Sequence, residues 1–233
     1  MRPEGLPVRE VCPGCRKALA RCYCHLVRPV RAGPKVVLLV HPREDRSRGA
    51  VNTSRMVRRC VEDAELLVGL DFRRHPRLEA LLAEPGLAPF LLYPGEEALD
   101  PGDPEVGRLL AGRRPLLLAL DGTWVQSRQM LRLAHRLAEL PRLRILPDRP
   151  SLMRFRRQPG ANCLCTLEAV HAALVGLHPW SPSGPPEALE AMLAVLRHVV
   201  DEQVALGGVP APRGPESGRE PRTSLDGLPE SPG

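Results

Sequence analysis

Aromatic residues are scarce in this chain, and long apolar segments are missing from it. Phenylalanine, tyrosine and tryptophan make up only 3% of the 233 residues, so the core has to be built from leucine, valine and alanine. The hydrophobic content of 43% is enough for one sizeable core at this length. No apolar run is long enough to span a bilayer, and the N-terminus has no charged segment followed by an apolar one. We therefore expect a cytoplasmic protein that is neither membrane-spanning nor secreted.

Lysine is also rare, although the chain is basic. Lysine and arginine together number 33 against 27 acidic residues, which gives a net charge of +6, and nearly all of these cations are arginine. An arginine bias can reflect a GC-rich genome. The guanidinium group is also the cation best suited to bidentate phosphate contacts. The composition is therefore compatible with a polyanionic partner.

Seven cysteines in a reducing compartment indicate metal ligands or buried thiols rather than disulfides. Cys12 and Cys15 form a C-x-x-C pair, and Cys22 and Cys24 form a C-x-C pair after six intervening residues. Two such pairs can place four thiolates tetrahedrally around one zinc ion. A thioredoxin-like redox pair is the alternative, but it requires a βαβ context and leaves the second pair unexplained. We expect these four cysteines to bind one structural zinc.

Short apolar runs alternate with helical patterns along the chain, which predicts an α/β fold with a mainly parallel sheet and helices on both faces. The predicted strands are Lys35–Val40, 64–68, 89–92, 116–120 and 143–146. The predicted helices are 52–61, 75–83, 124–138, Thr166–Leu177 and 185–206, and 101–112 is expected to hold a short helix at most.

Composition divides the chain into three parts. Residues 1–33 contain the cysteine pairs and are expected to form a small zinc-binding module. Residues 34–206 contain all the predicted strands and form the α/β domain. From residue 207 the chain is rich in glycine, proline, serine and glutamate, so 207–233 is expected to be a disordered tail.

The apolar run 116–120 is typical of a strand buried on both faces, and Asp121-Gly122-Thr123 connects it to the helix that begins at Trp124. Ligands of open α/β sheets bind outside the carboxyl ends of strands, so a carboxylate, a hydroxyl and an indole lie at the usual site edge. Asp and Thr before a helix are also common caps, and glycine eases such a turn. Spacing alone favours capping and leaves a chemical role open.

Basic residues surround an aromatic ring in 151–158, where three arginines flank Phe155. This combination suits phosphate contact together with base stacking, although a solvated amphipathic strand explains it equally well. His41 follows the first strand and is either a phosphate contact or a hydrogen-bonded loop residue. The candidate RNA contacts are His41, Arg43, Arg154, Arg156 and Arg157, while Arg16, Lys17 and Arg21 on the zinc loops are further contacts or solvated surface.

Five motifs resemble, in the same order, those of the DTW-domain family, the tRNA-uridine aminocarboxypropyltransferases. They are the cysteine cluster 12–24, His41-Pro42 with Asn52-Thr53, Leu92-Tyr93-Pro94, Asp121-Gly122-Thr123-Trp124 and Thr166-Leu167-Glu168-Ala169, and they span roughly residues 11–180. Cys165 departs from the pattern, because a small residue such as serine is expected there. Cys163 and Cys165 have no partner pair in the sequence, so we expect buried thiols rather than a second metal site.

The resemblance implies a SPOUT-like fold in which the chain near the cofactor is threaded as a knot. It implies transfer of the 3-amino-3-carboxypropyl group of S-adenosylmethionine to a uridine ring nitrogen in tRNA, with release of methylthioadenosine. Asp121 would be the catalytic residue, either gripping the donor's ammonium group or taking the uridine proton. The implied donor-binding residues are Leu92, Pro94, Thr123, Trp124, Leu146, Leu164 and Thr166.

Three alternatives to this function remain open. They are the same transfer on ribosomal RNA, a non-enzymatic zinc-bearing RNA-binding protein, and methyl transfer. The N-terminal cysteine cluster argues against the first, and an intact donor pocket would argue against the second. No obligate protein partner is implied.

Overall fold

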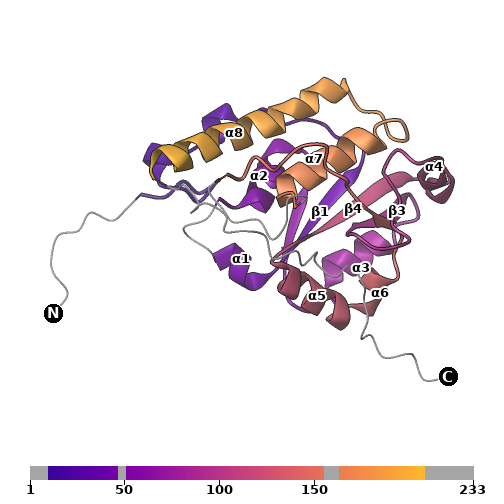
Figure 1. Cartoon of the computed structure of the whole chain (residues 1–233). Coiled ribbons are helices and arrows are strands. Elements are labelled where there is room, and N and C mark those ends of the chain that lie inside the picture. Colours follow the sequence, from indigo (N-terminus) through magenta and orange to yellow (C-terminus); the bar gives the residue numbers. More distant parts are fainter. Residues whose placement is uncertain (1–9, 47–50, 155–162, 208–233) are drawn as a thin grey trace, which may run out of the picture.

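The computed structural model describes residues 10–46, 51–154 and 163–207. Within them a five-stranded sheet runs in the order β2-β1-β4-β3-β5 (Figure 1). Its strands are β1 (Lys35–Val40), β2 (Glu65–Val68), β3 (Leu87–Leu92), β4 (Arg114–Asp121) and β5 (Arg142–Leu143). Every neighbouring pair is parallel. The predicted α/β fold with a parallel sheet is confirmed.

Helices lie on both faces of this sheet (Figure 1). One face carries α2 (Thr53–Cys60), α7 (Thr166–Leu177) and α8 (Glu190–Ala205), and the other carries α3 (Pro76–Leu82), α5 (Trp124–Leu133) and α6 (His135–Ala138). The remaining short elements are α1 (Pro42–Arg46), α4 (Pro104–Leu110) and the 3-10 turns η1 (Leu19–Arg21), η2 (Cys24–Leu26) and η3 (Pro186–Leu189). None of the helices in the described ranges combines the length and the apolar character needed to cross a lipid bilayer.

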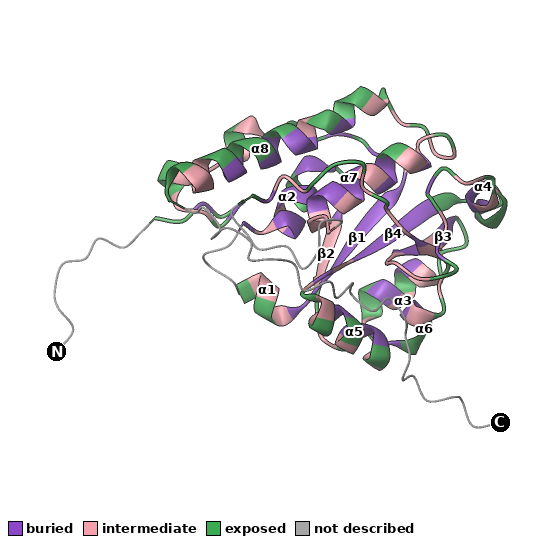
Figure 2. Ribbon diagram, in the orientation of Figure 1, coloured by how far each residue is buried: buried purple, intermediate pink, exposed green. Residues whose placement is uncertain are grey.

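The two faces of the sheet build two apolar clusters. On β1, Val36, Leu38 and Val40 pack toward α2, α7 and α8, whereas Val37 and Leu39 pack toward α3 and α5. Figure 2 shows β1 and β4 buried over most of their length. Parallel strands that are covered on both faces need continuous apolar runs. The apolar run 35–40 therefore predicted β1 correctly. Burial of each such side chain contributes on the order of 1.5–3 kcal/mol.

Some predicted elements have different limits in the structure. β5 covers only Arg142–Leu143 instead of the predicted 143–146, and the Arg144 backbone N–H that follows it donates to the Leu99 carbonyl in the β3–β4 connection (3.0 Å). The last helix begins as the 3-10 turn η3, so α8 starts at Glu190 rather than at residue 185. The structure also contains α1, which the sequence pattern did not predict.

The N-terminal cysteine segment packs onto α2 rather than standing apart. Tyr23 and Val27 are buried in the same apolar cluster as α2, α7 and α8. The Val30 backbone N–H donates to the Cys60 carbonyl (2.7 Å), and the Glu62 N–H donates to the Val30 carbonyl (3.1 Å). The stability of the cysteine segment and that of the sheet domain are therefore coupled through α2.

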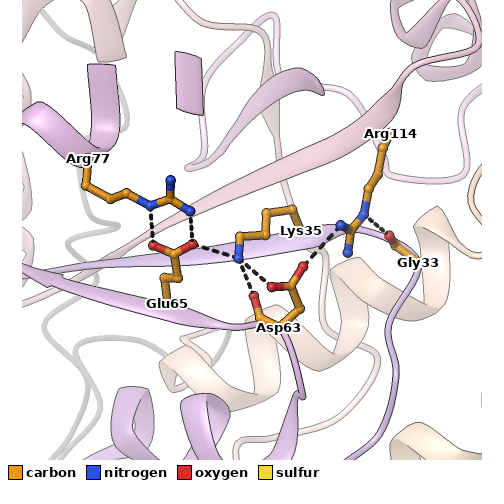
Figure 3. Close-up of polar contacts among 6 residues, drawn as sticks. All are labelled: Gly33, Lys35, Asp63, Glu65, Arg77 and Arg114. Atoms are coloured by element: carbon orange, nitrogen blue, oxygen red, sulfur yellow. Dashed lines mark hydrogen bonds and ion pairs between the residues drawn. The ribbon is translucent and has the colours of Figure 1, made fainter. Parts of the chain in front are cut away.

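A buried lysine ties together the amino ends of three strands (Figure 3). The Lys35 side chain is only 8% exposed, and its ammonium group contacts Asp63 Oδ1 (2.6 Å), Glu65 Oε1 (2.7 Å) and the Asp63 carbonyl (2.8 Å). Arg77 binds Glu65 with two nitrogens, and Arg114 binds Asp63 (3.1 Å). A buried ammonium group is tolerated because it has a partner for each of its three hydrogens.

The Glu65–Arg77 pair should make folding stability depend on pH. Hydrogen bonds from Arg77, with help from Lys35, lower the pKa of Glu65 from 4.5 to about 2. A carboxyl group with a lower pKa in the folded state stabilises the fold above about pH 4.5, and this stabilisation is lost as the pH falls towards 2. We expect Arg77→Gln to lower the free energy of unfolding at pH 7, and the difference from wild type to shrink below pH 4.5.

Urea unfolding at several pH values measures this effect. Arg73→Gln is the matched control, because Arg73 forms the same kind of pair with Asp71, but Asp71 is exposed and that pair should contribute little. A constant difference between wild type and Arg77→Gln from pH 7 to pH 2 would show that the pair does not act through the charge of Glu65.

Candidate active site and zinc site

The carboxyl ends of β1 and β4 form a topological switch point. These two strands are neighbours in the sheet, yet the chain leaves β1 towards α2 on one face and leaves β4 directly into α5 on the other. Ligands of open α/β sheets bind at such positions. The register pairs Val40 with Asp121, and the His41 backbone N–H donates to the Asp121 carbonyl (2.9 Å).

Asp121 and Thr166, which come from motifs far apart in the sequence, meet at this edge. The Thr166 hydroxyl donates to Asp121 Oδ1 (2.5 Å), and Asp121 is only 9% exposed. Thr166 is the first residue of α7, so the pair joins β4 to the start of a helix on one face of the sheet. A carboxylate held in this way at a strand end can accept a proton or bind a cation.

The side chain that caps the start of α5 is that of Thr123. The Gln126 backbone N–H donates to the Thr123 hydroxyl (3.3 Å), and the Thr123 N–H donates to Gln126 Oε1 (2.6 Å). This reciprocal pair is a capping box. The capping interpretation that the sequence favoured thus applies to Thr123, whereas the Asp121 side chain is directed to Thr166.

Two of the few aromatic residues lie together at the same carboxyl edge, because Tyr93 follows β3 and Trp124 begins α5 after β4. The rings of Tyr93 and Trp124 meet edge to face, with centroids 5.8 Å apart and an interplanar angle of 65°. The guanidinium carbon of Arg142 lies 5.8 Å from the Tyr93 centroid. Burial raises the pKa of Tyr93, so its hydroxyl stays neutral. Sequence reasoning placed Tyr93 in a motif without a role and missed Arg142, because only the pairing of β3 with β5 brings them together.

The other predicted donor-binding residues lie at the same edge, with one difference in burial. Leu92 ends β3, Pro94 follows it, and Leu164 precedes α7; all three are half-buried. Leu146 is 70% exposed on the segment after β5. The structure therefore gathers most of this set around β3, β4 and α7 and leaves Leu146 at the surface.

Glu168 organises the segment that leads to α7, a role that the sequence did not reveal. Its side chain is 7% exposed and accepts hydrogen bonds from the Ser151 hydroxyl (2.6 Å), the Leu152 N–H (2.7 Å) and the Cys165 N–H (3.0 Å). Burial and this carboxylate raise the pKa of Cys165 well above its usual value, so the thiol is neutral. Glu168 thereby fixes residues 151–153 against the start of α7.

The predicted RNA contacts differ in exposure. His41 is 6% exposed, its Nδ1 accepts the Arg43 N–H (3.2 Å), and burial lowers its pKa, so the imidazole is uncharged at neutral pH. Arg43 is exposed. Arg154 is exposed and forms an ion pair with Asp201 of α8. Arg156 and Arg157 lie outside the described residues.

The four N-terminal cysteines come together in an arrangement that could hold a metal ion. Sγ of Cys12 lies 3.8 Å from Sγ of Cys24, Sγ of Cys15 lies 3.8 Å from Sγ of Cys22, and all four sulfurs lie within 4.8 Å of one another. A tetrahedron with Zn–S bonds of about 2.3 Å has edges of about 3.8 Å, whereas a disulfide would require about 2.05 Å. The donor set therefore fits zinc, as the spacing predicted. Within the described ranges no other group of three or more such side chains has this geometry.

An open hollow lies at the opposite, amino edge of the sheet. Arg31, Gly33, Asp63, Arg114 and Ser183 line it together with four neighbours. Its charged groups already pair with one another, as Arg114 does with Asp63. The candidate site is therefore assigned from the side chains that converge at the carboxyl edge and not from this hollow.

Fold and site together define an α/β protein with a candidate ligand site at the sheet's switch point and an attached cluster of four cysteines that could hold a metal ion. The family model of the DTW domain matches residues 9–204, and the protein belongs to the DTW-domain family. The chain is also similar to the "tRNA-uridine aminocarboxypropyltransferase 2" of Drosophila melanogaster. The two are 26% identical over 208 residues, which cover 86% of this chain and 78% of that protein. No solved structure matches the chain significantly.

Proposed function

We propose that this protein transfers the 3-amino-3-carboxypropyl group of S-adenosylmethionine to a ring nitrogen of a uridine in tRNA and releases methylthioadenosine. The observation that carries the proposal is the buried Asp121–Thr166 pair at the switch point of a DTW-family chain, with the Tyr93–Trp124 ring pair at the same carboxyl edge of the sheet. The name of the Drosophila relative supports the same reaction class and the same kind of substrate.

The reaction needs a nucleophile, a base and control of geometry. The uridine nitrogen forms a bond to the methylene carbon of the carboxypropyl group, the carbon–sulfur bond breaks, and its electron pair stays on sulfur. The imide proton has to leave the nitrogen, and the Asp121 carboxylate is the group we assign to receive it or, alternatively, to hold the donor's ammonium group. Three carbons are attached to the sulfonium, so the product depends on which carbon faces the base.

The residues at the carboxyl edge have the chemistry that a sulfonium donor requires. A cation is attracted to aromatic rings and to carboxylates, and the carboxyl edge carries the rings of Tyr93 and Trp124 as well as Asp121. In this proposal the Trp124 indole lines one side of the donor pocket and shields the methyl group of the donor. The adenine is assigned to Leu92, Pro94, Leu146 and Leu164, and polar contacts are assigned to Thr123 and Thr166. When bound, the donor supplies an activated carbon and a neutral thioether leaving group.

The remaining parts of the proposal concern zinc, threading and RNA. Four protein ligands close the zinc site, so the ion holds the fold and does no chemistry. SPOUT-like threading of the chain near the donor site is part of the proposal, and it rests on membership of the family. The proposed RNA contacts are His41, Arg43, Arg154, Arg156 and Arg157, and Arg154 would exchange Asp201 for a phosphate.

A reaction of the purified protein with unmodified tRNA and S-adenosylmethionine tests the proposal. We expect mass spectrometry of the nucleosides to show aminocarboxypropyl uridine, with one methylthioadenosine released for each modified base. Ribosomal RNA is the parallel substrate and should remain unmodified. Methylated uridine, or product on ribosomal RNA alone, would contradict the assignment.

A further inference from the structure

Positive charge is concentrated in the N-terminal quarter of the chain. Residues 10–60 contain 12 lysines and arginines against three acidic residues, whereas residues 61–233 contain 19 against 23. The net charge of +6 therefore arises from this quarter, and the larger remainder is negative. Such an asymmetry attracts a polyanion to one part of the surface.

Helix α2 carries an arginine stripe that contacts the zinc loop. Arg55, Arg58 and Arg59 lie at positions i, i+3 and i+4 and share one side of the helix, while the residues between them face the core. A Cβ added to Gly14 would lie 3.2 Å from Cys24 Sγ and 3.4 Å from the guanidinium carbon of Arg59. The arginine at the end of the stripe therefore lies directly against the metal site.

A single carboxylate joins the zinc loop, α1 and α2. Asp45 of α1 forms ion pairs with Arg55 of α2 and with Arg16 of the zinc loop, where Nη1 and Oδ2 are 3.6 Å apart. Two cations thus neutralise one of the few acidic residues in this region. The backbone N–H of His41 donates a hydrogen bond to the Asp121 carbonyl, and α1 follows His41 directly. The N-terminal end of α1 therefore lies at the candidate active site.

Several cations on these elements have no acidic partner in the part of the chain that the structure describes. Arg43, Arg46 and Arg58 are exposed and form no ion pair with any acid in the described ranges. Cations of this kind are surrounded by counterions in water, and phosphates displace those counterions on binding. Zinc would hold the adjacent loop rigid, so its cations would be placed before RNA arrives.

We propose that the zinc loop, α1 and α2 form one basic face, made of Arg16, Arg43, Arg46, Arg58 and Arg59, that docks the phosphate backbone of tRNA and presents a uridine to the carboxyl edge. This inference rests on the proposed function and adds the surface that receives the substrate. It assigns a binding role to α2 and to the metal site, which have no part in the transfer chemistry.

The test compares two double variants that change the same charge. Arg43→Gln with Arg58→Gln alters the basic face. Arg31→Gln with Arg132→Gln is the control, because both residues are exposed but lie at the amino edge and at the end of α5. Fluorescence anisotropy gives the Kd for tRNA across a salt titration, and calorimetry gives donor affinity.

For the basic-face variant we expect the Kd for tRNA to rise on the order of tenfold per lost contact at about 0.1 M salt. The slope of log Kd against log salt should fall by roughly 1.5, with donor affinity unchanged. The control should change Kd by less than about threefold. Equal losses of tRNA affinity in both double variants, or no loss in the basic-face variant, would overturn the basic face. The same conclusion would follow if the wild-type protein bound anionic lipid vesicles but not tRNA. Wild-type binding of tRNA without release of methylthioadenosine would instead defeat the proposed function and leave the docking surface standing.

Discussion

Asp121→Asn is expected to reduce aminocarboxypropyl transfer by about 10²–10⁴-fold, the usual contribution of a positioned acid or base. The amide keeps the size of the carboxylate, and its oxygen can still accept the Thr166 hydroxyl, which lies 2.5 Å from Asp121 Oδ1. The fold should therefore survive with a loss of about 1 kcal/mol. What the variant lacks is the negative charge that holds an ammonium group or receives a proton.

Two measurements distinguish these roles. If Asp121 is the base, calorimetric titration should show normal donor affinity while kcat collapses, and if it grips the donor, the Kd for S-adenosylmethionine should rise as well. Asp103→Asn provides the matched control, because Asp103 is also a carboxylate near a helix start but accepts the Glu105 N–H (2.8 Å) at α4. Near-normal transfer by Asp121→Asn would leave this carboxylate with a structural role alone.

Cys22→Ser is expected to remove zinc and to lower the thermal midpoint by roughly 10 °C or more, since each kcal/mol corresponds to about 2–4 °C in a chain of this size. Structural zinc bound by four thiolates contributes several kcal/mol to the folded state of small domains. In this protein the loss of stability would extend to the α/β domain, because Tyr23 and Val27 of the cysteine segment are buried in the core that contains α2. Elemental analysis should fall from about one zinc per chain to near zero.

Cys163→Ser is the control for the loss of a thiol, because Cys163 lies outside the four-cysteine cluster. It should leave zinc content and the thermal midpoint close to wild type. A Cys22→Ser protein with a full complement of zinc and an unchanged midpoint would contradict the assignment of this site.

The sequence by itself determined the local features of this protein. The apolar run Lys35–Val40 predicted β1 with its observed limits, and the pattern from Thr166 predicted α7. The cluster of four cysteines was also predictable, because close cysteine pairs can meet without any distant part of the chain. The periodicity of apolar residues reports local burial, and the spacing of the cysteines reports local geometry. The strand, the helix and the cysteine cluster could be predicted because each depends only on such local information.

Only the tertiary structure decided which distant residues meet. Capping was the better explanation for the turn after β4 until Thr123 was seen to cap α5 and Asp121 to bind Thr166, 45 residues away. The Tyr93–Trp124 contact depends on the pairing of β3 with β4, and the proposed basic face depends on the ion pairs of Asp45 in α1 with Arg16 and Arg55. Sequence patterns carry no strand order, and a side chain's partner is set by which strand ends become neighbours, so these contacts arise only from the folded sheet.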